Sequence, residues 1–189
     1  YLLCSPCNNR HLFVVEIIMK ILHTSDWHLG QHFMGKSRQN EHAAFIDWLL
    51  NTVQEYAIDG VIIAGDVFDT GAPPSYAREL YNRFVVQMNQ LGCPLLVLAG
   101  NHDSVATLNE SKGLLAYLNA QVVTSAQHNP EQQVVVINNQ ANQPAALVCA
   151  IPFILPKDVL TSQAGESADY KQQALGRAIA EHYQAVYQA

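Results

Sequence analysis

The chain has 189 residues, of which 49% are hydrophobic and 14% are charged. This composition excludes a disordered chain and predicts one folded domain, or most of one, with a sizeable buried core. The formal net charge is −6, from 16 acidic and 10 basic side chains, which excludes a polycationic surface that binds nucleic acid by counterion release alone.

The first 18 residues precede Met19, the first methionine, which stands directly before a strand pattern at residues 20–24. We expect residues 1–18 to be an upstream or non-native extension and residues 19–189 to be the N-terminal part of a domain. Cys4 and Cys7 form a C-x-x-C pair, but no second cysteine pair or downstream histidine pair completes a zinc site. Because no convincing signal peptide is present, a cytoplasmic location is expected.

The next part of the chain alternates strand and helix patterns. Strand patterns at residues 20–24, 61–64 and 95–99 are separated by two amphipathic stretches. The first carries an apolar face from Phe45 to Tyr56 at helical spacing, and the second follows two prolines and ends at Gly92. This βαβαβ order predicts an α/β fold with a largely parallel, helix-covered sheet.

Later segments extend this pattern. Further strand patterns occur at residues 122–123, 134–137 and 146–151, and a helical pattern runs from Lys171 to Ala189. That helix has no glycine cap and no following strand, so we expect the domain to be incomplete at its C-terminus.

Each of the first three predicted strands runs into polar residues that can bind metals: SDWH (25–28), GDVFD (65–69) and GNHD (100–103). Asp26 and His28 are two residues apart, so in an extended segment their side chains point to the same side. Ligands of open α/β sheets bind beyond the carboxyl ends of the strands. Each segment alone is also typical of a polar turn or a helix N-cap, but the three together predict a metal centre.

The residue types in these segments limit the ion that can bind. They combine carboxylate, imidazole and amide oxygen without thiolate, which favours Mn²⁺, Mg²⁺ or Fe²⁺ over structural zinc. Two ions about 4 Å apart could clamp the attacking and leaving oxygens of a phosphoryl displacement. We therefore expect two divalent metal ions, with Mn²⁺ favoured, and Asp66 on the central strand as the bridging ligand.

The three motifs resemble those of the calcineurin-like metallophosphoesterases. The segments HTSDWHLG (23–30), GDVFDTGAPPS (65–75) and GNHDS (100–104) are similar to the nuclease branch of that superfamily. Phosphoprotein phosphatases usually carry GDxVDRG and GNHE, whereas Phe68, Thr70 and Asp103 stand at the differing positions here. The resemblance extends from Met19 through IPF (151–153) and TSQAG (161–165).

The resemblance implies a metallophosphoesterase fold of helix-covered β-sheets, arranged in four layers in the family. Carried over residue by residue, it implies that Asp26 and His28 bind the first metal. It also implies that Asp66 bridges the two metals and that Asn101 binds the second.

The resemblance also implies roles around the scissile phosphate. His102 becomes the catalytic histidine, which stabilises or protonates the leaving oxygen. Asp69 is expected behind the ligands or on the substrate side, since some relatives have histidine there. Asp103 is expected to orient His102.

At the level of the whole protein, the resemblance implies a DNA nuclease subunit. Its activities would be double-strand exonuclease and single-strand or hairpin endonuclease, in DNA repair, recombination and replication. Its partners would be DNA and an SMC-family ATPase, with a homodimer inside a heterotetramer.

Two other functions stay open. The family adds metal ligands from later Gly-His and Gly-His-x-His segments, and no such segment follows residue 103 here. The alternatives are a general metallophosphoesterase that acts on small phosphodiesters or phosphoproteins, and an inactive fragment.

Overall fold

The computed structural model describes residues 19–139, 141–161 and 167–189. The expected extension at residues 1–18, with its C-x-x-C pair, lies outside the described residues, as does most of the TSQAG segment.

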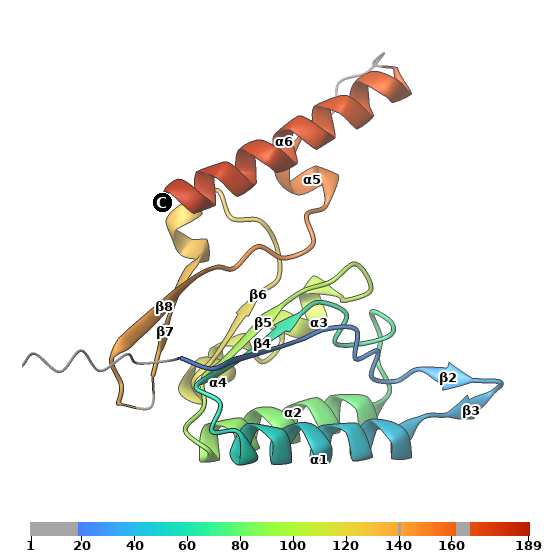
Figure 1. Ribbon diagram of the computed structural model, residues 1–189. Coiled ribbons are helices and arrows are strands. Elements are labelled where there is room, and N and C mark those ends of the chain that lie inside the picture. The colour runs from blue at the N-terminus through green and yellow to red at the C-terminus, as the bar shows by residue number, and fades with distance from the viewer. Residues whose placement is uncertain (1–18, 140, 162–166) are drawn as a thin grey trace, which may run out of the picture.

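A four-stranded parallel sheet forms the centre of the molecule (Figure 1). Its strands, in spatial order, are β1 (Ile21–Thr24), β4 (Gly60–Ala64), β5 (Leu95–Leu98) and β6 (Ala120–Val123). Thr24 pairs with Ile63, and Ala64 pairs with Leu98, so the carboxyl ends of the first three strands are nearly level. The predicted parallel α/β fold is confirmed, and the three polar loops leave the sheet at one edge.

Two helices cover one face of this sheet (Figure 1). They are α1 (Gln39–Glu55) and α2 (Ser75–Gln90), and α2 follows the two prolines as predicted. Gly92 has a left-handed φ of 67° just past the end of α2, which is the conformation expected of a helix-ending glycine. Apolar side chains from both helices and the sheet fill the main core, including Ile46, Leu49, Ile63, Phe84 and Val97.

A β-hairpin packs on the opposite face of the sheet, and a long helix lies further out. The antiparallel strands β7 (Val134–Asn138) and β8 (Pro144–Cys149) pack on it through a second core that includes Leu96, Val123 and Ile137. Helix α6 (Ala168–Gln188) lies beyond this hairpin and buries Val186 (Figure 1). The four-layer arrangement that the resemblance implied stays an expectation.

Several short elements had no periodic signal in the sequence. They are the strands β2 (His32–Phe33) and β3 (Lys36–Ser37), the helices α3 (Val105–Asn109), α4 (Lys112–Tyr117) and α5 (Pro156–Val159), and the 3₁₀ helix η1 (Pro130–Gln133). The β2–β3 hairpin turns at Met34 and Gly35, which both have left-handed φ, and it projects from the body (Figure 1). Among the described residues, no helix is both long and apolar enough to cross a membrane.

The loops after β4 and β5 are joined by one carboxylate, that of Asp103. It accepts hydrogen bonds from the backbone N–H groups of Gly100 at 2.9 Å, Val67 at 3.2 Å and Phe68 at 2.9 Å. These bonds fix the loop that carries His102, and the expectation that Asp103 orients His102 stays a prediction. Among the described residues, no hydrogen bond joins its carboxylate to the His102 ring.

Replacing Asp103 with asparagine should destabilise the fold. Asp103→Asn replaces one acceptor oxygen with an NH₂ group, which cannot accept the hydrogen bonds of the backbone N–H groups. Because hydrogen bonds to charged groups are stronger than neutral ones, we expect the free energy of unfolding to fall by about 2 kcal/mol. Urea unfolding would measure the free energy of unfolding. The control is Asp47→Asn, which removes an exposed ion pair with Arg83 and should cost about 0.5 kcal/mol or less. Equal losses for the two variants would contradict this role of Asp103.

Candidate metal centre

Main-chain hydrogen bonds join the loop after β1 to the loop after β4. The N–H of Asp26 donates to the carbonyl of Gly65 at 3.2 Å, and the N–H of His28 donates to the carbonyl of Asp66 at 3.0 Å. Asp26, His28 and Asp66 all adopt left-handed φ values, of 55°, 45° and 50°. Such conformations cost roughly 1–3 kcal/mol for residues other than glycine and persist only where the surroundings enforce them. The three strained residues are three of the predicted ligands.

These three side chains bring their donor atoms together. One donor atom from each of Asp26, His28 and Asp66 lies within 4.8 Å of the other two. His28 Nε2 is 3.9 Å from Asp26 Oδ1 and 4.0 Å from Asp66 Oδ2. Donor atoms at these separations can share a divalent cation with bonds of about 2.0–2.2 Å. The predicted grouping of Asp26 and His28 with Asp66 is thus present in the structure.

Asp66 is the buried member of the group, with 8% of its surface exposed. Its Oδ1 accepts a hydrogen bond from the backbone N–H of His102 at 2.9 Å, whereas Oδ2 faces His28. A Cβ atom at Gly100 would collide with this carboxylate, so the third loop needs glycine there. The two oxygens of Asp66 therefore have different surroundings, one anchored in the loop after β5 and one directed at the metal ligands.

His102 lies beside this group, and its ring is exposed. Its ring centroid is 5.0 Å from that of His28, in an edge-to-face arrangement. His102 Nδ1 is 3.1 Å from the main-chain oxygen of Asp69. A carbonyl oxygen can only accept, so this contact places the proton of a neutral imidazole on Nδ1 and leaves Nε2 unprotonated.

The carboxylate of Asp69 approaches His28 from the other side of its ring. Asp69 Oδ1 is 3.2 Å from His28 Nδ1, but the ring N–H is too far out of line to form a hydrogen bond. His28, Asp69 and His102 thus form a second group of metal-type donors that shares His28 with the first. Asn101 is exposed in the loop after β5, and its role as a metal ligand stays a prediction.

Two residues near this site were missed by the motif analysis. The side-chain amide of Gln31 donates through Nε2 to Asp69 Oδ1 at 3.4 Å, and Arg38 Nη1 donates to Gln31 Oε1 at 3.0 Å. They lie at the two ends of the β2–β3 hairpin. Because this hairpin has no strand signal in the sequence, no pattern linked the two residues to Asp69.

A buried histidine, His42 on α1, lies close to these charges. Burial lowers its pKa, and the positive charge of Arg38 lowers it further, so the imidazole is neutral at pH 7. The fixed charges at this edge of the sheet are therefore chiefly the carboxylates of Asp26, Asp66, Asp69 and Asp103. Such a concentration repels a phosphate ester unless cations are bound.

Comparison with known proteins identifies the family of the chain. Residues 19–169 match the family model described as calcineurin-like phosphoesterase. The chain is 59% identical over 169 residues to SbcD of the nuclease SbcCD from Escherichia coli (strain K12). It is 41% identical over 97 residues to the SbcD protein of Bacillus subtilis (strain 168), and 31% identical over 148 residues to that of Rhodobacter capsulatus.

These matches differ in how much of each protein they cover. The Escherichia coli match covers 89% of this chain but 41% of that protein. The matches to the Bacillus and Rhodobacter proteins cover 51% and 75% of this chain, and 25% and 36% of those proteins. The chain therefore spans about two-fifths or less of the length of these curated relatives. The family match covers most of the chain and includes all three loops of the site, and the chain belongs to the calcineurin-like phosphoesterase family.

Proposed function

We propose that this chain is part of a metal-dependent DNA nuclease subunit that hydrolyses phosphodiester bonds. The observation that carries the proposal is the convergence of donor atoms from Asp26, His28 and Asp66 at one edge of the parallel sheet. The identity to the SbcD proteins supports the nuclease branch over a phosphoprotein phosphatase. The pattern at Phe68, Thr70 and Asp103 favours the same branch.

The grouped donor atoms of Asp26, His28 and Asp66 support a divalent metal site, and we propose two ions, with Mn²⁺ favoured. Asp26 and His28 would bind the first ion, Asn101 the second, and Asp66 would lie between them. When bound, such ions supply Lewis-acid polarisation of the phosphoryl group and lower the pKa of water. The anchored Oδ1 of Asp66 limits rotation of its carboxylate, which keeps Oδ2 directed at His28.

His102 is the residue we expect to touch the substrate. The carbonyl of Asp69 fixes its Nδ1–H, so Nε2 is the nitrogen that is free to face a phosphate ester. When protonated, Nε2 can donate a hydrogen bond or a proton to the leaving oxygen, a task that imidazole performs near neutral pH. The exposure of the ring gives substrate access to it.

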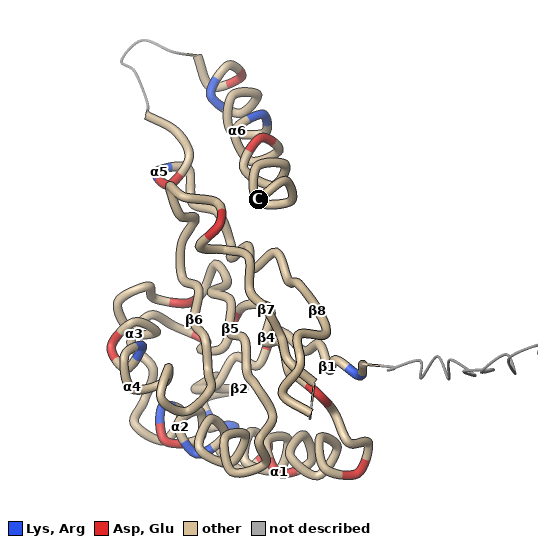
Figure 2. Tube along the Cα trace, turned by 90° about the vertical axis from the view of Figure 1, so that its left-hand side faces the viewer, with Lys and Arg blue, Asp and Glu red and all other residues tan. Residues whose placement is uncertain are grey.

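The charge distribution bears on how DNA would be bound. The chain has a formal charge of −6, and in the described residues the Lys and Arg positions are scattered over several elements (Figure 2). Two divalent ions would balance the four carboxylates at this edge, so that a phosphodiester is no longer repelled and can be bound by the ions. The remaining contacts to DNA are assigned to an SbcC-like SMC-family ATPase partner, in a cytoplasmic complex that contains a homodimer of the nuclease subunit. The pathways it would serve are DNA repair, recombination and replication.

Loss of the bridging carboxylate should remove metal binding. Asp66→Asn should weaken Mn²⁺ binding by about 100-fold or more, because even residues that only support a metal ligand are worth 10–100-fold. Calorimetric titration with Mn²⁺ measures the affinity. Asp47→Asn is the matched control, since it removes an exposed carboxylate on α1 that pairs with Arg83. Unchanged Mn²⁺ binding in Asp66→Asn would refute the centre.

Chelation and substrate choice separate the nuclease from the alternatives. With the ATPase partner present, the protein should degrade double-stranded DNA ends in Mn²⁺, lose this activity in excess EDTA and regain it when Mn²⁺ is restored. Cyclic nucleotides and phosphopeptides, assayed in parallel, should be poor substrates. Cleavage of DNA that persists in excess EDTA would rule the mechanism out, and preference for phosphopeptides would favour the general phosphoesterase.

Removal of the His102 ring should affect turnover more than metal binding. In the same DNA assay, His102→Asn should lower kcat by about 100-fold or more, the usual contribution of a general acid. Its Mn²⁺ affinity should change little, because the ring is held by the Asp69 carbonyl and is not among the predicted ligands. A parallel loss of kcat and Mn²⁺ affinity would instead make His102 a metal ligand.

A further inference from the structure

A series of polar side chains runs from the base of the β2–β3 hairpin to His28. Arg38 Nη1 donates to Gln31 Oε1 at 3.0 Å, and Gln31 Nε2 donates to Asp69 Oδ1 at 3.4 Å. The backbone N–H of Arg38 also donates to the carbonyl of Gln31 at 3.2 Å. Gln31 and Arg38 are therefore joined through both main chain and side chain, at the point where the hairpin leaves the body.

The donors and acceptors in this polar series are set by the residues at its two ends, Arg38 and Asp69. A guanidinium group only donates hydrogen bonds, and an ionised carboxylate only accepts them. Gln31 lies between them, so its amide oxygen must face Arg38 and its NH₂ group must face Asp69. Reversal of the amide would break both contacts, which makes Gln31 a directional link between Arg38 and Asp69.

The oxygen at the end of this polar series is the one that faces the predicted metal ligand. Asp69 Oδ1, which accepts from Gln31, is also the atom 3.2 Å from His28 Nδ1. His28 Nδ1 is buried without a hydrogen bond to any described residue, while Nε2 on the other side of the ring faces Asp26 and Asp66. A small shift of Asp69 would bring its oxygen into line with the Nδ1–H. The position of Asp69 thus bears directly on the orientation of the His28 ring.

We propose that Gln31 and Arg38 are positioning residues for the metal centre, which fix the Asp69 carboxylate beside His28 and so orient His28 Nε2 toward the ion. The proposal rests on the proposed function only in its assumption that His28 binds a divalent metal. Carboxylates behind histidine ligands commonly set ring orientation and ligand basicity. Here the Asp69 carboxylate is itself held by Gln31 and Arg38, at the base of a hairpin that carries no predicted ligand.

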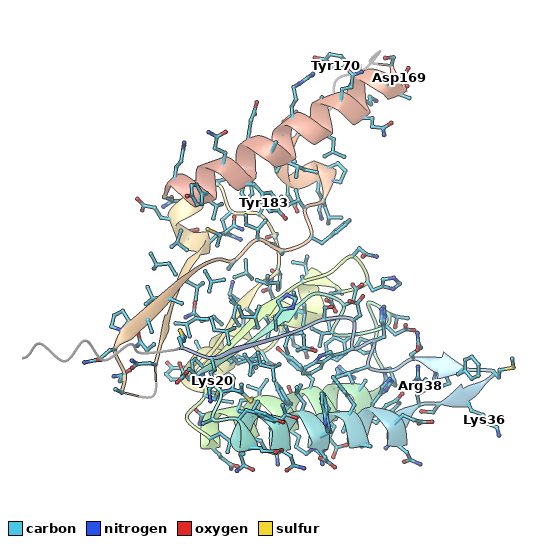
Figure 3. All side chains as sticks on the ribbon, viewed as in Figure 1. Lys20, Lys36, Arg38, Asp169, Tyr170 and Tyr183 are labelled. Carbon is cyan, nitrogen blue, oxygen red and sulfur yellow. The ribbon has the colours of Figure 1, made fainter. Side chains whose placement is uncertain are left out.

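If Arg38 acted only through its charge, its removal would change the Mn²⁺ affinity in the opposite direction from the one that positioning predicts. Arg38 is a cation near a site for divalent cations, so if it acted only through its charge, its removal should tighten Mn²⁺ binding. If it acts by positioning Asp69, its removal should weaken binding. Lys36 is the matched control, since it is an exposed cation further out along the same hairpin and outside the polar series (Figure 3).

The experiment measures Mn²⁺ affinity by calorimetry for the wild-type protein and for Arg38→Ala, Gln31→Leu and Lys36→Ala. Gln31→Leu keeps approximate volume and removes both hydrogen bonds. Arg38→Ala and Gln31→Leu should each weaken Mn²⁺ binding by about three- to tenfold, less than the 10–100-fold typical of a direct supporting group. Lys36→Ala should leave the affinity unchanged or slightly tighter. In an Asp69→Asn background, Gln31→Leu should cause no further loss, because its effect passes through Asp69.

The outcomes distinguish this proposal from the proposed function. Wild-type protein that binds no Mn²⁺ would overturn the metal centre itself. Wild-type binding that Arg38→Ala leaves unchanged or tightens would overturn the positioning role alone. Thermal unfolding checks that each variant is folded, and if Gln31→Leu is not, Arg38→Ala decides the matter, since Arg38 is only half-buried.

Discussion

The site depends on one buried carboxylate, that of Asp66, which contacts the other two loops of the centre. One of its oxygens accepts a hydrogen bond from the backbone N–H of His102 at 2.9 Å, and the other lies 4.0 Å from His28 Nε2. A buried carboxylate is costly unless its charge is compensated by hydrogen bonds or cations. Here the His102 amide satisfies one oxygen, and the other is available to the proposed cation. The left-handed backbone of Asp66 and the absence of a side chain at Gly100 both follow from this arrangement.

The site residues are held in place by hydrogen bonds between the three loops, not by contacts within the strands. Asp103 joins two of the loops by accepting hydrogen bonds from three backbone amides, and main-chain hydrogen bonds join the loop after β1 to the loop after β4. The acidic residues at this edge therefore have separate roles. Asp103 joins the loops by hydrogen bonds, Asp26 and Asp66 are the proposed oxygen ligands of a cation, and Asp69 contacts both histidines. This division explains how several carboxylates can lie together without all being ligands.

Asp69 connects the centre to the rest of the molecule. Its carbonyl sets the tautomer of His102, and its carboxylate lies between His28 and the hairpin residue Gln31. A change at the hairpin could thus reach both histidines through one residue. This links a projecting segment of the chain to the proposed chemistry of phosphodiester hydrolysis, and it distinguishes a positioning network from the ligands themselves.

The sequence by itself determined the parallel α/β sheet, its two covering helices and the grouping of Asp26, His28 and Asp66. It could do so because hydrophobic periodicity identifies strands and helices, and because parallel strands bring their carboxyl ends to one edge. Only the tertiary structure decided that Asp103 accepts hydrogen bonds from three backbone amides, and that Gln31 contacts both Arg38 and Asp69. Those contacts depend on loop conformations and on a hairpin with two-residue strands, which are too short to leave a periodic pattern.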